Sequence, residues 1–277
     1  MEKDPAALLG SGLPNLGGDA GGHLNLDPRA RAPATKRDRN DVPLPGGNRA
    51  DAAASDGERI LNEETKTLLV RGAAQLGVSL SSEQIDSLLL YHSELIRWNE
   101  KVNLTGLREA REITIKHFLD SLTPLAFLRP AGGERWIDVG TGAGFPGLVL
   151  KIACPDLEMI LIEATGKKVT FLHHLIGLLR LKGVAVVHDR LERLRGPEWQ
   201  EGGDLVVTRA LAPAFVMEEG RALVRKGGRM LFFQGPPDAS RWEQALKRYP
   251  ELVLEKICPV ALPFTEESRS LVFLKAV

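Results

Sequence analysis

The chain has 277 residues, and its 36 lysines and arginines balance 36 aspartates and glutamates, so the formal net charge is zero. This balance excludes a protein whose whole surface binds nucleic acid phosphates, although it leaves room for a local basic cleft. Two cysteines are too few for a disulfide framework or a cysteine-rich zinc site, and no apolar run is long enough to cross a membrane, so we expect a cytoplasmic protein without a metal centre.

Residues 1–57 are predicted to form a disordered tail. They contain nine glycines, six prolines and ten alanines, but no phenylalanine, tryptophan or tyrosine. Such a composition cannot bury enough apolar surface to offset the entropy of ordering the chain. Basic residues of this segment could contact nucleic acid: Arg29, Arg31, Lys36, Arg37 and Arg39. The acidic residues among them and the lack of aromatic rings favour a solvated tail instead.

Residues 58–130 carry a helical pattern. Ser81 and Gln84 are spaced as in a capping box, and the apolar residues that follow fall on one helical face. This pattern predicts a helix that runs to about Trp98. Two more helices are predicted over residues 61–76 and 110–128.

Strands alternate with helices over residues 131–277. Strands are predicted at 135–139, 158–163, 184–188, 205–208 and 230–233, with helices near 146–153, 167–181, 212–225 and 239–248. Strands that are apolar on both faces, with helices between them, indicate a mostly parallel sheet covered on both sides, which is a Rossmann-like α/β fold. The last two apolar stretches, 252–260 and 270–275, have no helix between them and predict an antiparallel hairpin at the end of the sheet.

A glycine-rich loop between the first strand and its helix is the most informative segment. It reads Asp138-Val-Gly140-Thr-Gly142-Ala-Gly-Phe145-Pro-Gly, and ligands bind at this position in doubly wound folds. A dinucleotide loop needs a third glycine where Phe145 stands, and Asp138 would repel a pyrophosphate. The carboxylate suits a cationic ligand such as S-adenosylmethionine, which carries an ammonium group and a sulfonium.

The end of the second strand adds a second acidic residue. Glu163 lies where a carboxylate can accept hydrogen bonds from both ribose hydroxyls of an adenosine. The alternative is a glycine turn that only packs a helix against the sheet. The acidic residues before and after the loop favour the cofactor site.

Five motifs together resemble the bacterial RsmG (GidB) family. They are Trp98-Asn-Glu-Lys-Val-Asn103-Leu-Thr105, His117-Phe-Leu-Asp-Ser121, the loop 138–147, Gly166-Lys167-Lys168-Val-Thr-Phe-Leu172 and Thr208-Arg209-Ala210. The resemblance covers roughly residues 60–276. It implies a class I S-adenosylmethionine-dependent methyltransferase fold with an N-terminal helical part. It also implies methylation of N7 of a guanine in 16S ribosomal RNA.

The resemblance further implies roles for individual residues. Contacts to S-adenosylmethionine are expected from Gly140, Phe145, Leu191, Glu192 and Arg209, beside Asp138, Gly142 and Glu163 of the loop region. Contacts that bind or position RNA are expected from Asn103, His117, Lys167 and Arg190. From the sequence alone, Arg209 could equally form a surface ion pair, and His117 could be a core or capping histidine.

The chemistry of guanine N7 argues against a general base. N7 carries an in-plane lone pair and no proton, so alignment with the methyl group should suffice, and we expect no essential base or covalent nucleophile. Cys154 and Cys258 have no partner motif and are expected to be structural. One departure from the family pattern is Gln234, which stands where a lysine is common and puts one RNA phosphate contact in doubt.

The expected partner is 16S rRNA within the small ribosomal subunit or its precursor, bound by a monomer. Three other functions remain open: a methyltransferase for small molecules or proteins with the same cofactor site, a nicotinamide-dependent dehydrogenase, and a non-catalytic ribosome-assembly factor. Asp138 and Phe145 disfavour the dehydrogenase.

Overall fold

The computed structural model describes residues 56–200 and 202–277. The tail expected over residues 1–57 lies outside this part, apart from Asp56 and Gly57, which begin helix α1 (Asp56–Gln75). Within the described residues, no helix combines the length and the apolar character needed to cross a membrane.

Helix α2 (Ser82–Val102) begins at the predicted capping box. The Ser81 hydroxyl accepts from the amide of Gln84 at 3.3 Å, and the Gln84 side chain accepts from the amide of Ser81 at 2.8 Å. The helix continues past Trp98 and ends at Asn103, whose φ of 46° is the left-handed conformation typical of a helix C-terminus.

The single helix predicted over residues 110–128 is wrong. The segment consists of α3 (Ala110–Ile113), a π-helical turn η1 (Thr114–Leu119), α4 (Asp120–Leu122) and a 3-10 turn η2 (Thr123–Ala126). Pro124 lacks the amide that a continuous α-helix would need at this point. π turns inside helices occur frequently at functional sites, so this segment is a candidate for one.

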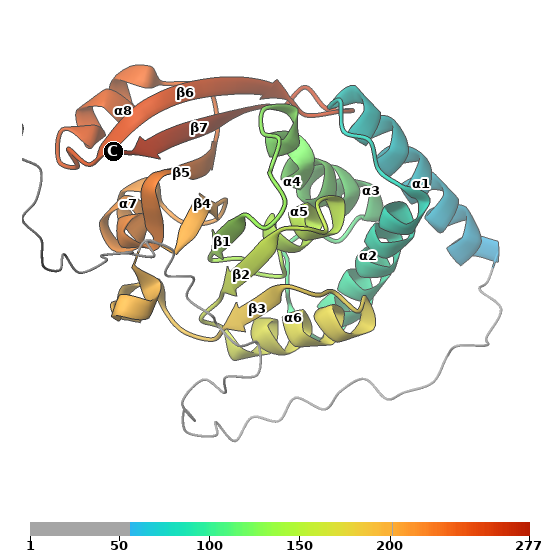
Figure 1. Cartoon of the computed structure of the whole chain (residues 1–277). Helices are drawn as coiled ribbons and strands as arrows, with labels where there is room; N and C mark the ends of the chain where they lie inside the picture. The colour runs from blue at the N-terminus through green and yellow to red at the C-terminus, as the bar shows by residue number, and fades with distance from the viewer. Residues whose placement is uncertain (1–55, 201) are drawn as a thin grey trace, which may run out of the picture. The chain divides into compact units, whose positions relative to one another are not determined.

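A seven-stranded sheet forms the centre of the fold, in the order β3-β2-β1-β4-β5-β7-β6 (Figure 1). Its strands are β1 (Arg135–Val139), β2 (Glu158–Ile162), β3 (Val184–Val187), β4 (Gly203–Thr208), β5 (Val224–Gln234), β6 (Leu252–Ala261) and β7 (Ser268–Ala276). The first five pair in parallel, while β7 lies antiparallel between β5 and β6. The mostly parallel sheet and the C-terminal hairpin are therefore confirmed.

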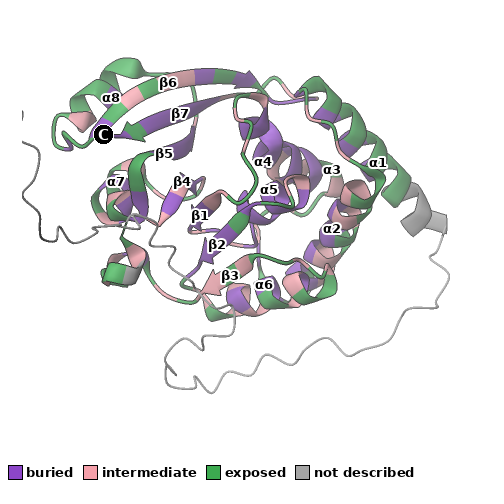
Figure 2. Cartoon of the chain, in the orientation of Figure 1, coloured by how far each residue is buried: buried purple, intermediate pink, exposed green. Residues whose placement is uncertain are grey.

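Both faces of the sheet are covered, as the strand composition predicts. Successive residues of a strand point to opposite faces, so Trp136 packs with one cluster and Ile137 with the other. Helices α5 (Gly147–Ala153) and α6 (Gly166–Leu178) cover the first face, and α7 (Pro213–Gly220) and α8 (Ala239–Leu246) contribute buried residues to the second. Strands β1, β2, β4 and β7 are largely buried, whereas the edge strands β3 and β6 are more exposed (Figure 2).

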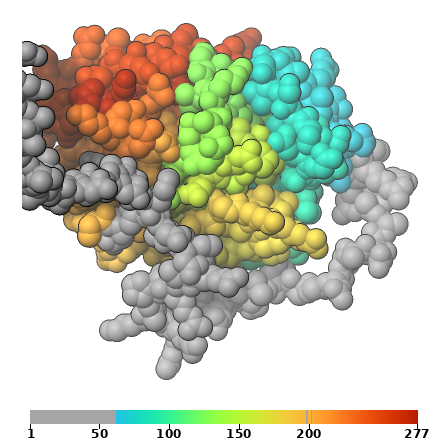
Figure 3. Space-filling model, in the orientation of Figure 1, coloured from blue at the N-terminus to red at the C-terminus, as the bar shows by residue number. Residues whose placement is uncertain are grey.

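The N-terminal helices share a core with the sheet. Leu69 of α1, Leu95 of α2 and Leu119 of the π turn are fully buried in the same cluster as Leu148 of α5 and Phe273 of β7. On the face shown in Figure 3, the segment drawn in green lies between most of the blue and cyan N-terminal part and the orange C-terminal part. The helical part and the sheet are thus bound together by buried apolar contacts, which stabilise the edge where the glycine loop lies.

Close packing of α5 against the sheet gives a stability prediction. A Cβ on Gly147 would lie 2.5 Å from Leu161 and 2.7 Å from the Asp138 carboxylate, both in the core. Gly147→Ala is therefore expected to lower the free energy of unfolding by about 1–3 kcal/mol, measured by urea titration. Gly166→Ala is a matched control, because Gly166 also begins a helix but its Cβ would lie 3.5 Å from His188, an ordinary contact. Equal stability of the two variants would contradict this prediction.

Candidate functional site

The glycine loop turns tightly at the carboxyl end of β1. Gly140, Gly142 and Gly144 have φ values of 70°, 64° and 103°, which disfavour any residue with a Cβ. A Cβ on Gly140 would also lie 2.8 Å from Leu211. The amides of Gly140 and Thr141 donate to the carbonyl of Ile162 at the end of β2, at 3.0 and 3.1 Å. The loop is therefore fixed to two strands at once.

Asp138 lies beneath this loop and is fully buried. One carboxylate oxygen, Oδ2, accepts from the amide of Gly147 at 2.8 Å, while Oδ1 has no hydrogen-bond partner. Burial raises the pKa of Asp138 to about 6. A buried carboxylate with a free oxygen favours a positive charge nearby, so Asp138 suits a loop that binds a cationic group.

Glu163 holds the loop from the end of β2. Its Oε2 accepts from the amide of Gly142 at 2.9 Å, and its Oε1 accepts from the amide of Thr165 at 2.8 Å. Each carboxylate oxygen keeps a further lone pair, so Glu163 can accept additional hydrogen bonds from a ligand while it orders the loop.

Arg209 connects the end of β4 to the π turn. Its guanidinium donates to the main-chain carbonyls of Lys116 at 3.1 Å and His117 at 3.4 Å. Its Cζ lies 5.3 Å from the centre of the Phe145 ring, a cation–π contact. The Phe145 ring is buried between His117 and Tyr91, with centroid distances of 4.7 and 5.2 Å. Phe145 therefore joins the loop to the N-terminal helices, and a ligand can reach its backbone rather than its ring.

His117 is neutral at physiological pH. Burial and the adjacent Arg209 guanidinium lower the pKa of His117 to about 3. Its Nδ1 lies 3.1 Å from an Arg209 nitrogen, which must donate, so the ring proton is assigned to Nε2, 2.6 Å from the Thr105 hydroxyl. Both ring nitrogens are therefore occupied.

The other residues expected to bind ligands lie along the same sheet edge or near it. Leu191 is buried in the turn after β3, and Glu192 beside it lies 3.7 Å from the guanidinium of Arg190. The Arg190 side chain is 65% exposed, and Lys167 is half-buried at the start of α6. Asn103 is exposed at the end of α2 and accepts from Arg108 at 3.3 Å. Asn103 precedes the cavity residue Thr105 by two positions and belongs to the N-terminal helices rather than to the glycine loop.

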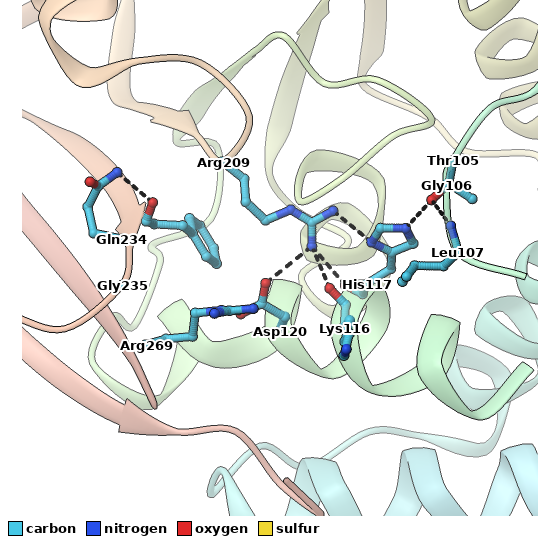
Figure 4. Close-up of a pocket in the computed structure, with 11 residues that line it drawn as sticks. Thr105, Gly106, Leu107, Lys116, His117, Asp120, Arg209, Gln234, Gly235 and Arg269 are labelled. Atoms are coloured by element: carbon cyan, nitrogen blue, oxygen red, sulfur yellow. Dashed lines mark hydrogen bonds and ion pairs between the residues drawn. The ribbon is translucent and has the colours of Figure 1, made fainter. Parts of the chain in front are cut away.

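A cavity of about 540 Å³ opens beside Arg209 (Figure 4). It is lined by Thr105, Gly106, Leu107, Lys116, His117, Asp120, Arg209, Phe233, Gln234, Gly235 and Arg269. The volume lies within the range of about 300–1,000 Å³ typical of small-molecule sites. Gln234 lines it with a side chain that donates to the carbonyl of Phe233 at 2.7 Å.

Sequence reasoning did not assign Asp120 and Arg269 to a site. Asp120 is 3% exposed and pairs with Arg209 at 3.4 Å. Arg269 reaches the same carboxylate from β7 at 3.7 Å. One signal for Asp120 was available, because a charged residue three positions after His117 in an apolar segment falls on the same helical side. Nothing in the sequence predicts the pairing with Arg269.

Two groups of residues therefore meet at Arg209. The glycine loop with Asp138 and Glu163 forms a cradle with a buried negative charge, which fits the ammonium, sulfonium and ribose of S-adenosylmethionine. The cavity beyond Arg209 has room for a second molecule. Such an arrangement can hold two reactants next to each other, which is what a group transfer requires.

Known proteins resemble this chain over most of its length. A family model described as rRNA small subunit methyltransferase G (GidB) matches residues 84–272. A protein named Ribosomal RNA small subunit methyltransferase G from Caldanaerobacter subterraneus subsp. tengcongensis is 38% identical over 221 residues, 78% of this chain and 92% of its own length. One of the same name from Geobacter sp. strain M21 is 39% identical over 217 residues, 76% of this chain and 98% of its own.

Among solved structures, a SAM-dependent methyltransferase from Aquifex aeolicus superposes with a TM-score of 0.47 and 19% identity, covering 63% of this chain and 97% of its own. The family model spans more than half of the chain, and the two bacterial relatives are covered over more than nine-tenths of their own length. The glycine loop, the π turn and Arg209 all fall inside the matched region. This chain belongs to the rRNA small subunit methyltransferase G (GidB) family.

Proposed function

We propose that this protein transfers a methyl group from S-adenosyl-L-methionine to N7 of a guanine in 16S ribosomal RNA. The observation that carries the proposal is the contact of Arg209 with both the glycine loop, through Phe145, and the cavity, through Asp120. A methyl donor in the loop and an acceptor base in the cavity would then lie on either side of one residue.

Each residue proposed to hold the cofactor contacts a particular chemical group of S-adenosylmethionine. Asp138 supplies negative charge beneath the loop, and Gly140 and Gly142 allow close approach of the backbone. Glu163 accepts hydrogen bonds from the ribose hydroxyls, and Leu191 and Glu192, in the turn after β3, contact the adenine. Phe145 and Arg209 close the side toward the cavity.

The transfer needs alignment rather than proton removal. The bound cofactor supplies a methyl group on a sulfonium: the N7 lone pair forms the new N–C bond, the S–C electron pair stays on sulfur, and the guanine ring becomes cationic. The protein keeps the two reactants in line, and its buried carboxylates tolerate the new positive charge. No residue has to accept a proton.

The rate of transfer is therefore expected to be independent of His117 ionisation. Because its pKa is about 3 and both ring nitrogens are occupied, His117 should neither gain nor lose a proton during turnover. The single-turnover rate should be flat between about pH 7 and pH 8.5. If His117→Ala abolished transfer while folding and the affinities for cofactor and substrate survived, the proposal of a reaction without a general base would fail.

The RNA is proposed to lie across the carboxyl edge of the sheet, beside the glycine loop. The protein is proposed to bind the small subunit or its precursor as a monomer. Exposed Arg190 and half-buried Lys167 supply local positive charge on a near-neutral chain, and Asn103 supplies a polar contact. Each phosphate that these residues neutralise releases counterions, so affinity should fall as salt rises.

The test is incubation with methyl-labelled S-adenosylmethionine and small subunits that lack the modification, with separate readouts for RNA and protein. Label in 7-methylguanosine of the RNA supports the proposal. Label in protein or in a small molecule would support a methyltransferase of another specificity, and binding to subunits without any transfer would support an assembly factor.

A further inference from the structure

Each cation that lines the cavity is paired with a carboxylate, either in the lining or just outside it. Lys116 pairs with Glu112 at 3.1 Å and with Glu267 at 3.2 Å. Arg269 pairs with Glu267 at 3.0 Å. Arg209 pairs with Asp120, so each cation of the lining already has an acidic partner. A cavity balanced in this way favours an uncharged planar group over a phosphate.

Asp120 is paired with Arg209, but one of its two carboxylate oxygens lacks a hydrogen-bond donor. Its side chain is 4% exposed and its Oδ2 faces Arg209, but its Oδ1 has no hydrogen-bond partner. The Nε of Arg269 lies 3.7 Å from Oδ1, beyond hydrogen-bond distance. Burial raises the pKa of Asp120, and the two arginines oppose that rise. A buried acceptor without a donor is costly, so a ligand that supplies donors would bind favourably here.

Guanine presents the matching edge. Its N1–H and N2 amine are adjacent donors, with the O6 acceptor next to them, whereas adenine presents the N1 lone pair and would repel a carboxylate. N7 lies on another edge of the guanine ring, away from N1 and N2. A guanine that places N1 and N2 on Asp120 therefore turns N7 away from this carboxylate and leaves it free for the methyl group.

We propose that Asp120 is the residue that selects guanine: its carboxylate accepts from N1–H and the N2 amine, and the guanidinium of Arg269 donates to O6. The Arg269 side chain is 29% exposed and covers Oδ1 through a loose contact, so the base edge displaces it toward O6. This assignment rests on the proposed function. It explains why a buried carboxylate is kept between two arginines at the cavity.

The experiment compares guanosine with inosine, which lacks only the N2 amine, at the methylated position of reconstituted small subunits. A hydrogen bond to a charged group changes a rate by roughly ten- to hundredfold, so the wild type should prefer guanosine by about tenfold or more. In Asp120→Ala the guanosine-to-inosine ratio should fall to near one, and in Asp120→Asn, whose amide keeps one acceptor oxygen, it should fall below the wild-type value. Asp86→Asn, an exposed position on α2, should keep the wild-type ratio.

Arg269→Ala distinguishes loss of base selectivity from a general loss of activity. Both bases carry O6, so this variant should slow both substrates equally and leave the ratio unchanged. Thermal unfolding and cofactor affinity of each variant are measured alongside. Where a variant is too slow to assay, the ratio of its affinities for the two subunits replaces the ratio of rates.

A wild-type ratio in both Asp120 variants would overturn the assignment. A wild-type enzyme that shows no guanosine preference would also overturn it. Failure of the wild type to methylate guanosine at all would instead refute the proposed function. The two failures are therefore distinguishable.

Discussion

Asp138→Asn is expected to weaken S-adenosylmethionine binding by about tenfold or more without lowering stability. Asparagine can still accept from the amide of Gly147, so the loop keeps its anchor. The substitution removes the negative charge that favours the sulfonium and ammonium groups. It also removes a cost, because a pKa raised from 3.8 to about 6 means that the ionised form is disfavoured in the folded protein by about 3 kcal/mol.

The pH dependence follows from the direction of this shift. The folded protein holds the Asp138 proton more tightly than the unfolded chain, so stability is greatest below about pH 4 for this group and declines as the pH rises to about 6. Cofactor binding has the opposite trend, since protonation below about pH 6 removes the attractive charge.

Isothermal titration and thermal unfolding across this pH range check both effects. The wild type should bind the cofactor more weakly below about pH 6, and Asp138→Asn should lose that dependence. The exposed Asp86→Asn variant should behave as the wild type in both measurements. Unchanged affinity in Asp138→Asn would show that the charge beneath the loop has no part in binding.

Arg209→Ala is expected to lower the free energy of unfolding by about 2–4 kcal/mol and to abolish methyl transfer. The Arg209 side chain is 17% exposed, and its removal would leave Asp120 and the carbonyls of Lys116 and His117 without this donor. Its contact with the Phe145 ring would also be lost. The N-terminal helices would then be less firmly joined to the loop.

Two further variants test this explanation by urea titration. Arg209→Ala combined with Asp120→Asn should recover part of the lost stability, because no buried charge is left unpaired. Arg190→Ala, at a side chain that is 65% exposed, should change stability by less than about 0.5 kcal/mol. A double variant no more stable than Arg209→Ala alone would show that the Asp120 charge is not the cause.

The strands were predictable from the sequence because both faces of the sheet are buried. Apolar runs mark such strands directly, and the predicted bounds of β1 agree with Arg135–Val139 in the structure. Helix α2 was predictable for a local reason, since its capping box involves only residues three apart. The glycine loop was predicted as a ligand-binding loop because it lies between a predicted strand and a predicted helix.

The parts that sequence reasoning missed depend on contacts between distant segments. The π turn interrupts a predicted helix where Arg209, some 90 residues away, donates to the Lys116 and His117 carbonyls. Asp120 pairs with Arg209, directly after β4, and with Arg269 of β7, which no local pattern indicates. The sequence shows that Phe145 stands where a dinucleotide loop needs a glycine. Its packing against Tyr91, more than 50 residues away in the chain, is visible only in the fold.

The measurement that tests the central proposal most directly is nucleoside mass spectrometry of small-subunit rRNA from cells with and without this protein. Loss of the protein should remove one 7-methylguanosine. The wild-type chain should restore it, and a chain carrying Asp138→Ala should not. An unchanged 7-methylguanosine content in cells that lack the protein would contradict the proposed function.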